Sequence, residues 1–137
     1  IRGIEATTNW SYGLTVKNWA VRPGLQASLT VMDHMDLEWR EPLTYRPKQI
    51  AALKASLKIQ KFSAQVDYRY ASRIEAVKIY PINRRVPMKF IDLRFTYDFG
   101  FLSLKAGISN LNNYNYAPME SNLMPMRTYT VGVQGEL

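Results

Sequence analysis

The sequence contains no cysteine and a single histidine in 137 residues, so common side chains for metal centres and covalent catalysis are scarce. The absence of cysteine excludes thiol nucleophiles, disulfide frameworks and cysteine-based metal sites. His34 lies beside Asp33 and close to Asp36. We interpret it as a solvated loop residue rather than a metal ligand or a member of a catalytic triad. We therefore expect no catalytic residue, no cofactor and no bound metal.

Long hydrophobic runs are also missing. No run reaches about 18 apolar residues, which excludes a transmembrane helix. Hydrophobic residues nevertheless make up 47% of the chain and charged residues 21%, which is too apolar for disorder. The net charge of +7 is scattered along the chain, with Arg84 and Arg85 as its densest point, so we do not expect nucleic-acid binding. An anionic outer leaflet or the lumen of a pore is a better match for such charge.

Apolar and polar residues alternate with a period of two in segment after segment, which predicts β-strands with one apolar face. The clearest case is the stretch at 90–99, where aliphatic and aromatic residues alternate with Asp, Arg and Thr. We predict an all-β antiparallel structure of about seven strands, near residues 3–10, 25–32, 50–59, 62–73, 88–99, 102–109 and 127–137. Turn signals at Tyr12-Gly13 and Pro23-Gly24 leave 11–24 open as one loop or an extra strand piece.

The connections between these strands differ in length. Gly100-Phe101 suits a two-residue type II′ turn that sets Phe99 opposite Leu102, and Gln60-Lys61 is a second tight turn. The expected connections are about 14, 17, 2, 16, 2 and 17 residues long, so short and long alternate from the third onward. That asymmetry is typical of outer-membrane barrels, which have periplasmic turns and extracellular loops. Strands of such barrels need only about 9–11 residues.

Periodicity assigns side chains to two faces. In a membrane barrel the apolar face meets lipid and the polar face meets the lumen. We expect lipid-facing positions at Leu93, Phe95, Tyr97, Leu104 and Val131. We expect lumen-facing positions at Glu5, Asp67, Arg69, Asp92 and Arg94. Asp67 and Asp92 also fit the paired acids of a glycosidase. Because each has an Arg two residues on, we favour charge pairing in the lumen wall.

Six segments occur in an order that is similar to a known family. They are RGIEATTNW (2–10), LTYRPKQIAALKASL (43–57), DYRYASRIE (67–75), RVPMKFIDLRFTYDF (85–99), GISNLNNYNY (107–116) and MRTYTVGVQGEL (126–137). Together they resemble the C-terminal part of TonB-dependent outer-membrane receptors. The resemblance implies a transmembrane barrel of about 22 strands with a plug, of which this chain is the last third.

The resemblance also implies a function and partners. Such receptors take up scarce ligands such as siderophores, cobalamin or glycans across the bacterial outer membrane. The implied partners are outer-membrane lipid, the remaining barrel strands and plug of the same receptor, and an energy-coupling protein that acts through parts outside this chain. Asn113, Tyr114 and Tyr116 lie in an Asn- and Tyr-rich segment, and we expect them to contact ligand from an extracellular loop.

Two alternatives remain open from the sequence. One is a complete small barrel of eight strands with a structural or adhesion role, which an eighth strand within 11–24 would favour. The other is a soluble β-sandwich or lipocalin-like binding protein, which solubility without detergent would favour. Seven strands do not close a barrel, so we expect the first and last strands to pair with material outside this chain. Starting at Ile1 without Met, the sequence is expected to be a processed or partial chain.

Overall fold

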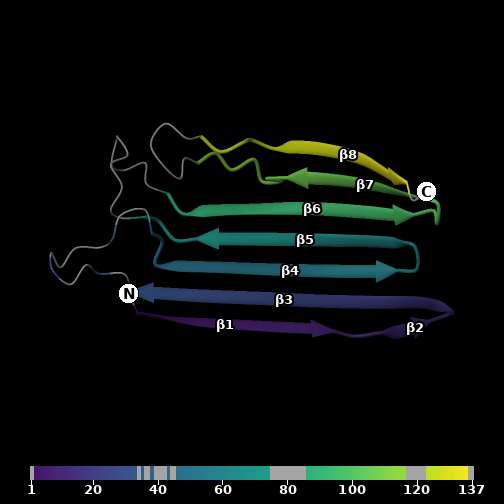
Figure 1. Cartoon of the computed structure of the whole chain (residues 1–137), viewed down its shortest axis with the longest axis horizontal. Coiled ribbons are helices and arrows are strands. Elements are labelled where there is room, and N and C mark those ends of the chain that lie inside the picture. The colour runs from purple at the N-terminus through teal and green to yellow at the C-terminus, as the bar shows by residue number, and fades with distance from the viewer. Residues whose placement is uncertain are drawn as a thin grey trace.

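The computed structural model describes residues 2–33, 35, 38, 43, 46–74, 86–116 and 123–135. These residues form a single antiparallel sheet of eight strands (Figure 1). The strands are β1 (Arg2–Ser11), β2 (Leu14–Val16), β3 (Trp19–Asp33), β4 (Gln49–Ile59), β5 (Phe62–Ala71), β6 (Met88–Asp98), β7 (Leu102–Ser109) and β8 (Thr128–Gly135). Within the described ranges there is no helix, and hence none long and apolar enough to cross a membrane.

The sheet is an up-and-down meander with the strand order β1-β3-β4-β5-β6-β7-β8. It does not close on itself, so β1 and β8 are its two edges. The extra strand β2 pairs only with β3 and continues the register of β1, because Ser11 pairs with Gly24 and Leu14 with Val21. The eight strands therefore occupy seven positions across the sheet.

Pro23 explains why β1 and β2 are separated. The backbone N–H of Tyr12 donates to the carbonyl of Pro23 at 3.1 Å. Pro23 has no N–H with which to return a hydrogen bond, so the ladder is interrupted at this point. The expected strand at 25–32 begins earlier, at Trp19, so the estimate of a 14-residue connection before it was wrong. Of the two alternatives left open for 11–24, the extra strand piece is confirmed as β2. Lys17 and Asn18 make the turn instead, with φ of +46° and +68°, the left-handed pair of a type I′ hairpin.

Tight turns and long connections alternate along the whole chain. The tight turns follow β2, β4 and β6 and lie together at one end of the sheet, which we call the turn end (Figure 1). Strands β3, β5 and β7 finish at the opposite end of the sheet, which we call the loop end. Gly100 has a φ of +98°, and the N–H of Phe99 donates to the carbonyl of Leu102 at 2.8 Å, as expected for that hairpin. Residues 136–137 of the expected last strand lie outside the described residues.

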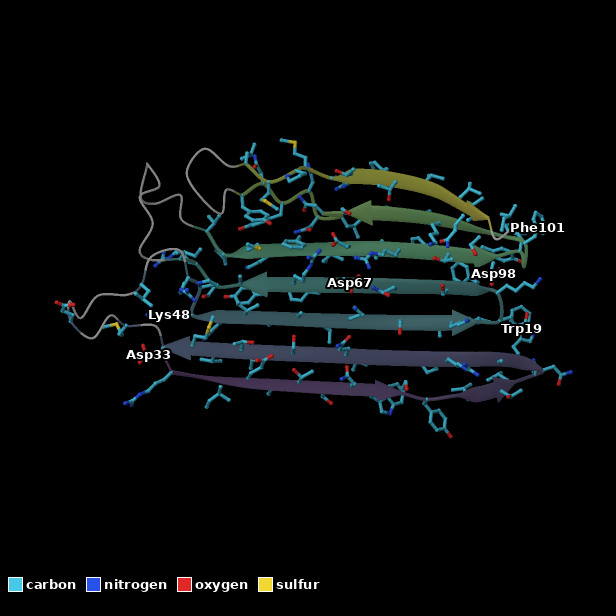
Figure 2. The ribbon with its side chains drawn as sticks, in the orientation of Figure 1. Trp19, Asp33, Lys48, Asp67, Asp98 and Phe101 are labelled. Atoms are coloured by element: carbon cyan, nitrogen blue, oxygen red, sulfur yellow. The ribbon has the colours of Figure 1, made fainter. Side chains whose placement is uncertain are left out.

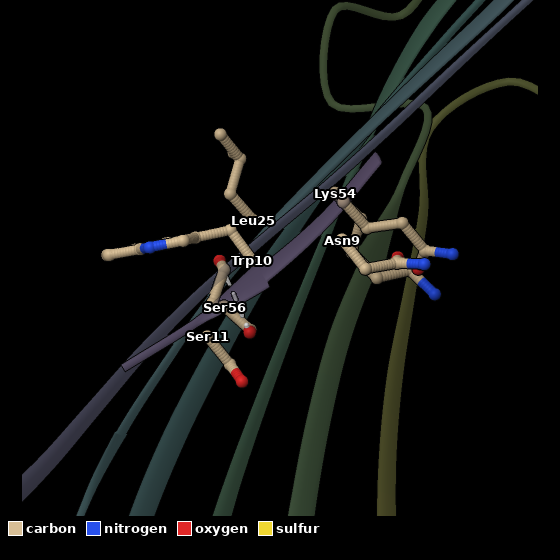
Figure 3. A pocket seen from close by; sticks show the side chains of 8 residues that line it. Asn9, Trp10, Ser11, Leu25, Lys54 and Ser56 are labelled. Carbon is tan, nitrogen blue, oxygen red and sulfur yellow. Dashed lines mark hydrogen bonds between the residues drawn. The ribbon is translucent and has the colours of Figure 1, made fainter. Parts of the chain in front are cut away.

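The strand pairings place most apolar side chains on one face of the sheet and most polar side chains on the other. The apolar face consists of even-numbered residues on β1, β2, β5 and β7 and odd-numbered residues on β3, β4, β6 and β8. Ala55, Val66 and Leu93 illustrate it, because each lies directly opposite the next across β4, β5 and β6. The remaining strand residues form the polar face. Figure 3 shows Trp10 and Leu25 projecting from one side of the sheet and Asn9 and Lys54 from the other.

Burial in this sheet is inverted relative to a soluble domain. The side chains of Val131 and Ile4 at the edges are 78% and 77% exposed, and even Leu53 on central β4 is 42% exposed. Asp67 and Asp92 on the polar face are instead only 7% and 5% exposed. All strand–strand contacts among the described strands are between neighbours in the sheet, so no described strand packs across either face. Within the described part of the chain, the apolar face therefore has no protein core beneath it.

Gln60 offers a test of the turn geometry, because this non-glycine residue has a φ of +49°. A left-handed conformation costs an L-residue roughly 1–2 kcal/mol, whereas ordering a glycine costs roughly 0.5–1 kcal/mol. We expect Gln60→Gly to raise the free energy of unfolding by about 0.5–1 kcal/mol, measured by urea unfolding with tryptophan fluorescence. The control Lys61→Gly should give no gain. Equal effects of both changes would show that strain at Gln60 is not relieved.

Candidate functional site

The centre of the polar face carries a four-residue cluster of charges on β5 and β6. Asp67 lies directly opposite Asp92, and each strand places an Arg two residues further on. In an antiparallel pair this spacing puts each Arg diagonally across from the aspartate of the other strand. Arg69 forms an ion pair with Asp92, and the Nη2 of Arg94 lies 3.7 Å from the Oδ2 of Asp67. We call Asp67, Arg69, Asp92 and Arg94 the ion-pair ladder.

Further hydrogen bonds satisfy both carboxylates of the ladder. Gln65 Nε2 donates to Asp67 Oδ2 at 2.7 Å, and the backbone N–H of Asn110 donates to Asp92 Oδ1 at 2.9 Å. Two like charges directly opposite each other destabilise a strand pair, and buried carboxylates need partners. The arginines and these donors supply that compensation. The expectation of charge pairing between the two Asp-x-Arg segments is confirmed.

An aromatic group joins the ladder to the loop end of the sheet. The guanidinium of Arg69 lies 4.3 Å from the centroid of the Phe90 ring, a cation–π contact. The rings of Phe90 and Tyr116 are stacked with centroids 6.1 Å apart, and Tyr114 stacks on Tyr116 at 5.9 Å. Burial raises the pKa of the Tyr116 phenol above its ordinary value; nearby Arg69 lowers it and Asp92 adds to the rise. The phenol is therefore neutral at physiological pH.

Asn110 organises the chain that leaves β7. Its side chain is buried, and its Nδ2 donates to the carbonyls of Tyr114 at 3.0 Å and Pro125 at 3.1 Å. Its Oδ1 accepts the N–H of Tyr114 at 2.8 Å. The φ of +53° at Asn110 is one that asparagine tolerates better than most residues. This residue thus ties together the two ends of the β7–β8 connection.

The predicted ligand-contacting residues lie in this same segment. Asn113 Oδ1 accepts the N–H of Arg127 at 3.0 Å, and the hydroxyl of Tyr114 donates to the carbonyl of Pro87 at 2.8 Å. Tyr116 is only 6% exposed. Their polar groups therefore hold the loop end together, and contact with a ligand stays a prediction. A hollow of about 200 Å³ adjoins Tyr116 and is partly walled by Met124 and Met126.

The structure places the two predicted sets of wall residues on opposite faces. Leu93, Phe95, Tyr97, Leu104 and Val131 all lie on the apolar face of β6, β7 and β8. Glu5, Asp67, Arg69, Asp92 and Arg94 all lie on the polar face. Glu5 is separate from the ladder, because it lies opposite Thr30 at the β1 edge.

Sequence reasoning missed the contributions of Phe90 and Asn110. Phe90 stands at a polar-face position, opposite Arg69, and there it serves the cation–π contact. Asn110 had no signal beyond its place in an asparagine-rich segment, since its partner Pro125 is remote in sequence. His34 and Asp36 lie outside the described residues. Within the part of the chain that is described, no group of three His, Cys, Asp or Glu side chains could hold a metal ion.

Comparison with known proteins does not assign the chain to a family. No protein-family model matches it, and a search among curated proteins finds no significant relative. Its class is therefore defined by its fold and its two faces alone. That class is a single-layer antiparallel meander with an exposed apolar face and a charged polar face.

The ion-pair ladder predicts unequal roles for its two arginines. Arg69→Met leaves the buried Asp92 without its cation, whereas Arg94→Met removes a longer contact from a 60% exposed side chain. We expect a loss of about 1–3 kcal/mol in unfolding free energy for the first variant and under about 1 kcal/mol for the second. Urea unfolding measures both. Adding Asp92→Leu to Arg69→Met should recover part of the loss, and equal losses for the two single variants would contradict the assignment.

Proposed function

We propose that this chain forms part of the wall of an outer-membrane β-barrel belonging to a TonB-dependent receptor. The observation that carries the proposal is the inverted burial, with apolar side chains exposed on central strands and aspartates buried on the opposite face. A sheet of this kind is stable where its apolar face meets hydrocarbon and its polar face meets a hydrated or plugged lumen.

Water is a poor environment for the apolar face. Its exposed residues run from Ile4 on β1 through Leu53 and Phe95 to Val131 on β8, and therefore cross the entire sheet. Soluble monomers rarely expose contiguous apolar patches larger than about 300–600 Å². A soluble sandwich would need a second layer over this face, and the described strands provide none. A membrane removes the same surface from water without one.

Strand length and aromatic placement support the same environment. Apart from β2 and the longer β3, the strands have 8–11 residues, close to the length that a tilted strand needs to cross a bilayer. Exposed aromatic side chains on the apolar face lie mostly toward the turn end, at Trp10, Tyr12, Trp19, Phe62, Phe95, Tyr97 and Phe99, and Tyr129 lies toward the loop end. Trp19 and Phe101 are seen at that end in Figure 2. Tyr and Trp favour the membrane–water interface.

The two edges favour a larger barrel over a small one. An open edge in lipid leaves N–H and C=O groups unsatisfied, at several kcal/mol each. β2 continues the line of β1 and adds no position across the sheet, so it does not turn this meander into an eight-stranded barrel. We propose that β1 and β8 pair with the remaining strands of a barrel of about 22 strands.

The receptor assignment rests on the ordered sequence motifs described above. In that role the polar face, with its ion-pair ladder, faces the lumen and plug, and the long connections at the loop end face the cell exterior. Uptake concerns a scarce ligand such as a siderophore, cobalamin or glycan. The energy-coupling protein acts through parts outside this chain, and the proposal gives the chain no catalytic role.

Labelling of intact bacteria tests both localisation and orientation. Two single variants, Leu123→Cys at the loop end and Lys61→Cys at the turn end, each introduce one thiol into a chain that has no cysteine of its own. A membrane-impermeant maleimide should label the Leu123→Cys variant in intact cells. It should label the Lys61→Cys variant only after the outer membrane is permeabilised.

The unsubstituted protein gives the background for this labelling. Release of the protein by osmotic shock, with both variants labelled in the released fraction, would support the soluble binding protein instead. Labelling of both variants in intact cells would show that the turn end does not face the periplasm.

A further inference from the structure

Two cations face each other directly on the polar face near the turn end. Arg22 on β3 lies opposite Lys58 on β4, and Lys54 lies four residues away along β4. Like charges placed directly opposite destabilise a strand pair unless a counter-charge is near. No ion pair is formed by Arg22, Lys54 or Lys58 with any acid in the described residues. The described residues therefore provide no counter-charge for these three cations.

The described acids of the polar face either have other partners or lie away from Arg22 and Lys58. Asp67 lies opposite Lys54 but is held by Gln65 and Arg94, and Asp92 is held by Arg69. Asp98 accepts the N–H of Gly100 at 2.8 Å in its own turn. Glu5 is near the loop end of β1, opposite Thr30. Among the described residues, no acid therefore compensates the positive charge of Arg22 and Lys58.

A hollow of about 270 Å³ on the same strands has Lys54 and Ser56 in its wall (Figure 3). Arg22 and Lys58 do not line it, but on the same face they stand two residues beyond its wall residues Gly24 and Ser56. The hollow forms around Gly24, which follows Arg22 by two residues on the same face and contributes no side chain. A Cβ at Gly24 would stand 2.7 Å from Ser56 Oγ, so a larger residue here would displace the Ser56 hydroxyl. The polar groups at its wall come from Asn9, Ser11, Gln26, Lys54 and Ser56. Hydroxyls, amides and an ammonium all offer hydrogen-bond donors.

We propose that this hollow, with Arg22 and Lys58 beside it, binds an oxyanion carried by a solute, namely a carboxylate or phosphate group. The cations attract the anion, the donors of the wall orient it, and its charge relieves the repulsion between Arg22 and Lys58. The inference rests on the proposed function, because it requires the polar face to be hydrated. The site lies toward the turn end, away from the ligand residues expected in the β7–β8 connection.

Charge-selective thiol labelling tests the site. Ser63 lies opposite Lys58 on the polar face, and Ser103 lies opposite Asp98 on the same face. The variants Ser63→Cys and Ser103→Cys are each reconstituted in lipid vesicles. Rates are measured with an anionic and a cationic methanethiosulfonate reagent of similar size. We expect the ratio of anionic to cationic rate to be about tenfold or more higher for Ser63→Cys than for Ser103→Cys.

Competition by oxyanions shows whether the cations only attract the anionic reagent or whether the hollow also binds an oxyanion. Inorganic phosphate or acetate should slow the reaction of the anionic reagent with Ser63→Cys more than chloride does at equal ionic strength, and the stronger of the two identifies the preferred group. Adding Arg22→Gln and Lys58→Gln should abolish both the rate ratio and the protection. Adding Lys89→Gln and Arg127→Gln instead removes the same charge at the loop end and should change neither.

The outcomes separate this inference from the proposed function. If the Ser63→Cys thiol reacts with both reagents but shows no charge preference, or no protection by either oxyanion, the binding site is refuted while a hydrated polar face stands. If this thiol reacts with neither reagent, the polar face is not hydrated at this position and the site is refuted, while the labelling of intact cells decides the proposed function separately.

Discussion

One constraint underlies the whole structure: each strand pairing must keep apolar side chains opposite apolar side chains on the same face. A slip of one residue between any two strands would bring polar side chains onto that face. Seven strand positions hold this registration, from Ala6 opposite Leu29 at one edge to Ala106 opposite Val131 at the other. Because nothing in the described chain covers that face, its surroundings must supply the apolar environment that a protein core usually provides.

The polar face is stabilised differently, by ion pairs and hydrogen bonds between its side chains rather than by exclusion of water. Asp67 and Asp92 can lie side by side because Arg69, Arg94, Gln65 and the Asn110 backbone N–H satisfy them. The same network reaches the loop end, where Asn110 joins the two ends of the β7–β8 connection. Near the turn end pairing is incomplete, and the unsatisfied charge of Arg22 and Lys58 is there available to a solute.

Local features could be predicted from the sequence, and long-range ones could not. Period-two alternation at 90–99 and the glycine at Gly100 act over neighbouring residues, so the β6–β7 hairpin and its faces follow from sequence. The spacing of Asp and Arg also predicted the ion-pair ladder. Pro23-Gly24 was interpreted as a turn signal, but β3 runs through both residues. The proline removes one hydrogen bond of the ladder, and the strand that is interrupted there is its neighbour β1. The role of Asn110 depends on Pro125, fifteen residues away, which periodicity does not encode.

The central claim is that the apolar face touches hydrocarbon tails. Solid-state NMR of the protein in lipid bilayers tests it by transferring magnetisation to side chains from either lipid acyl chains or water. On edge strand β8 the account predicts rapid transfer from acyl chains to the methyl groups of Val131 and Val133, and from water to Thr130 and Gln134. Transfer from water to the valines, or none from lipid, would contradict it.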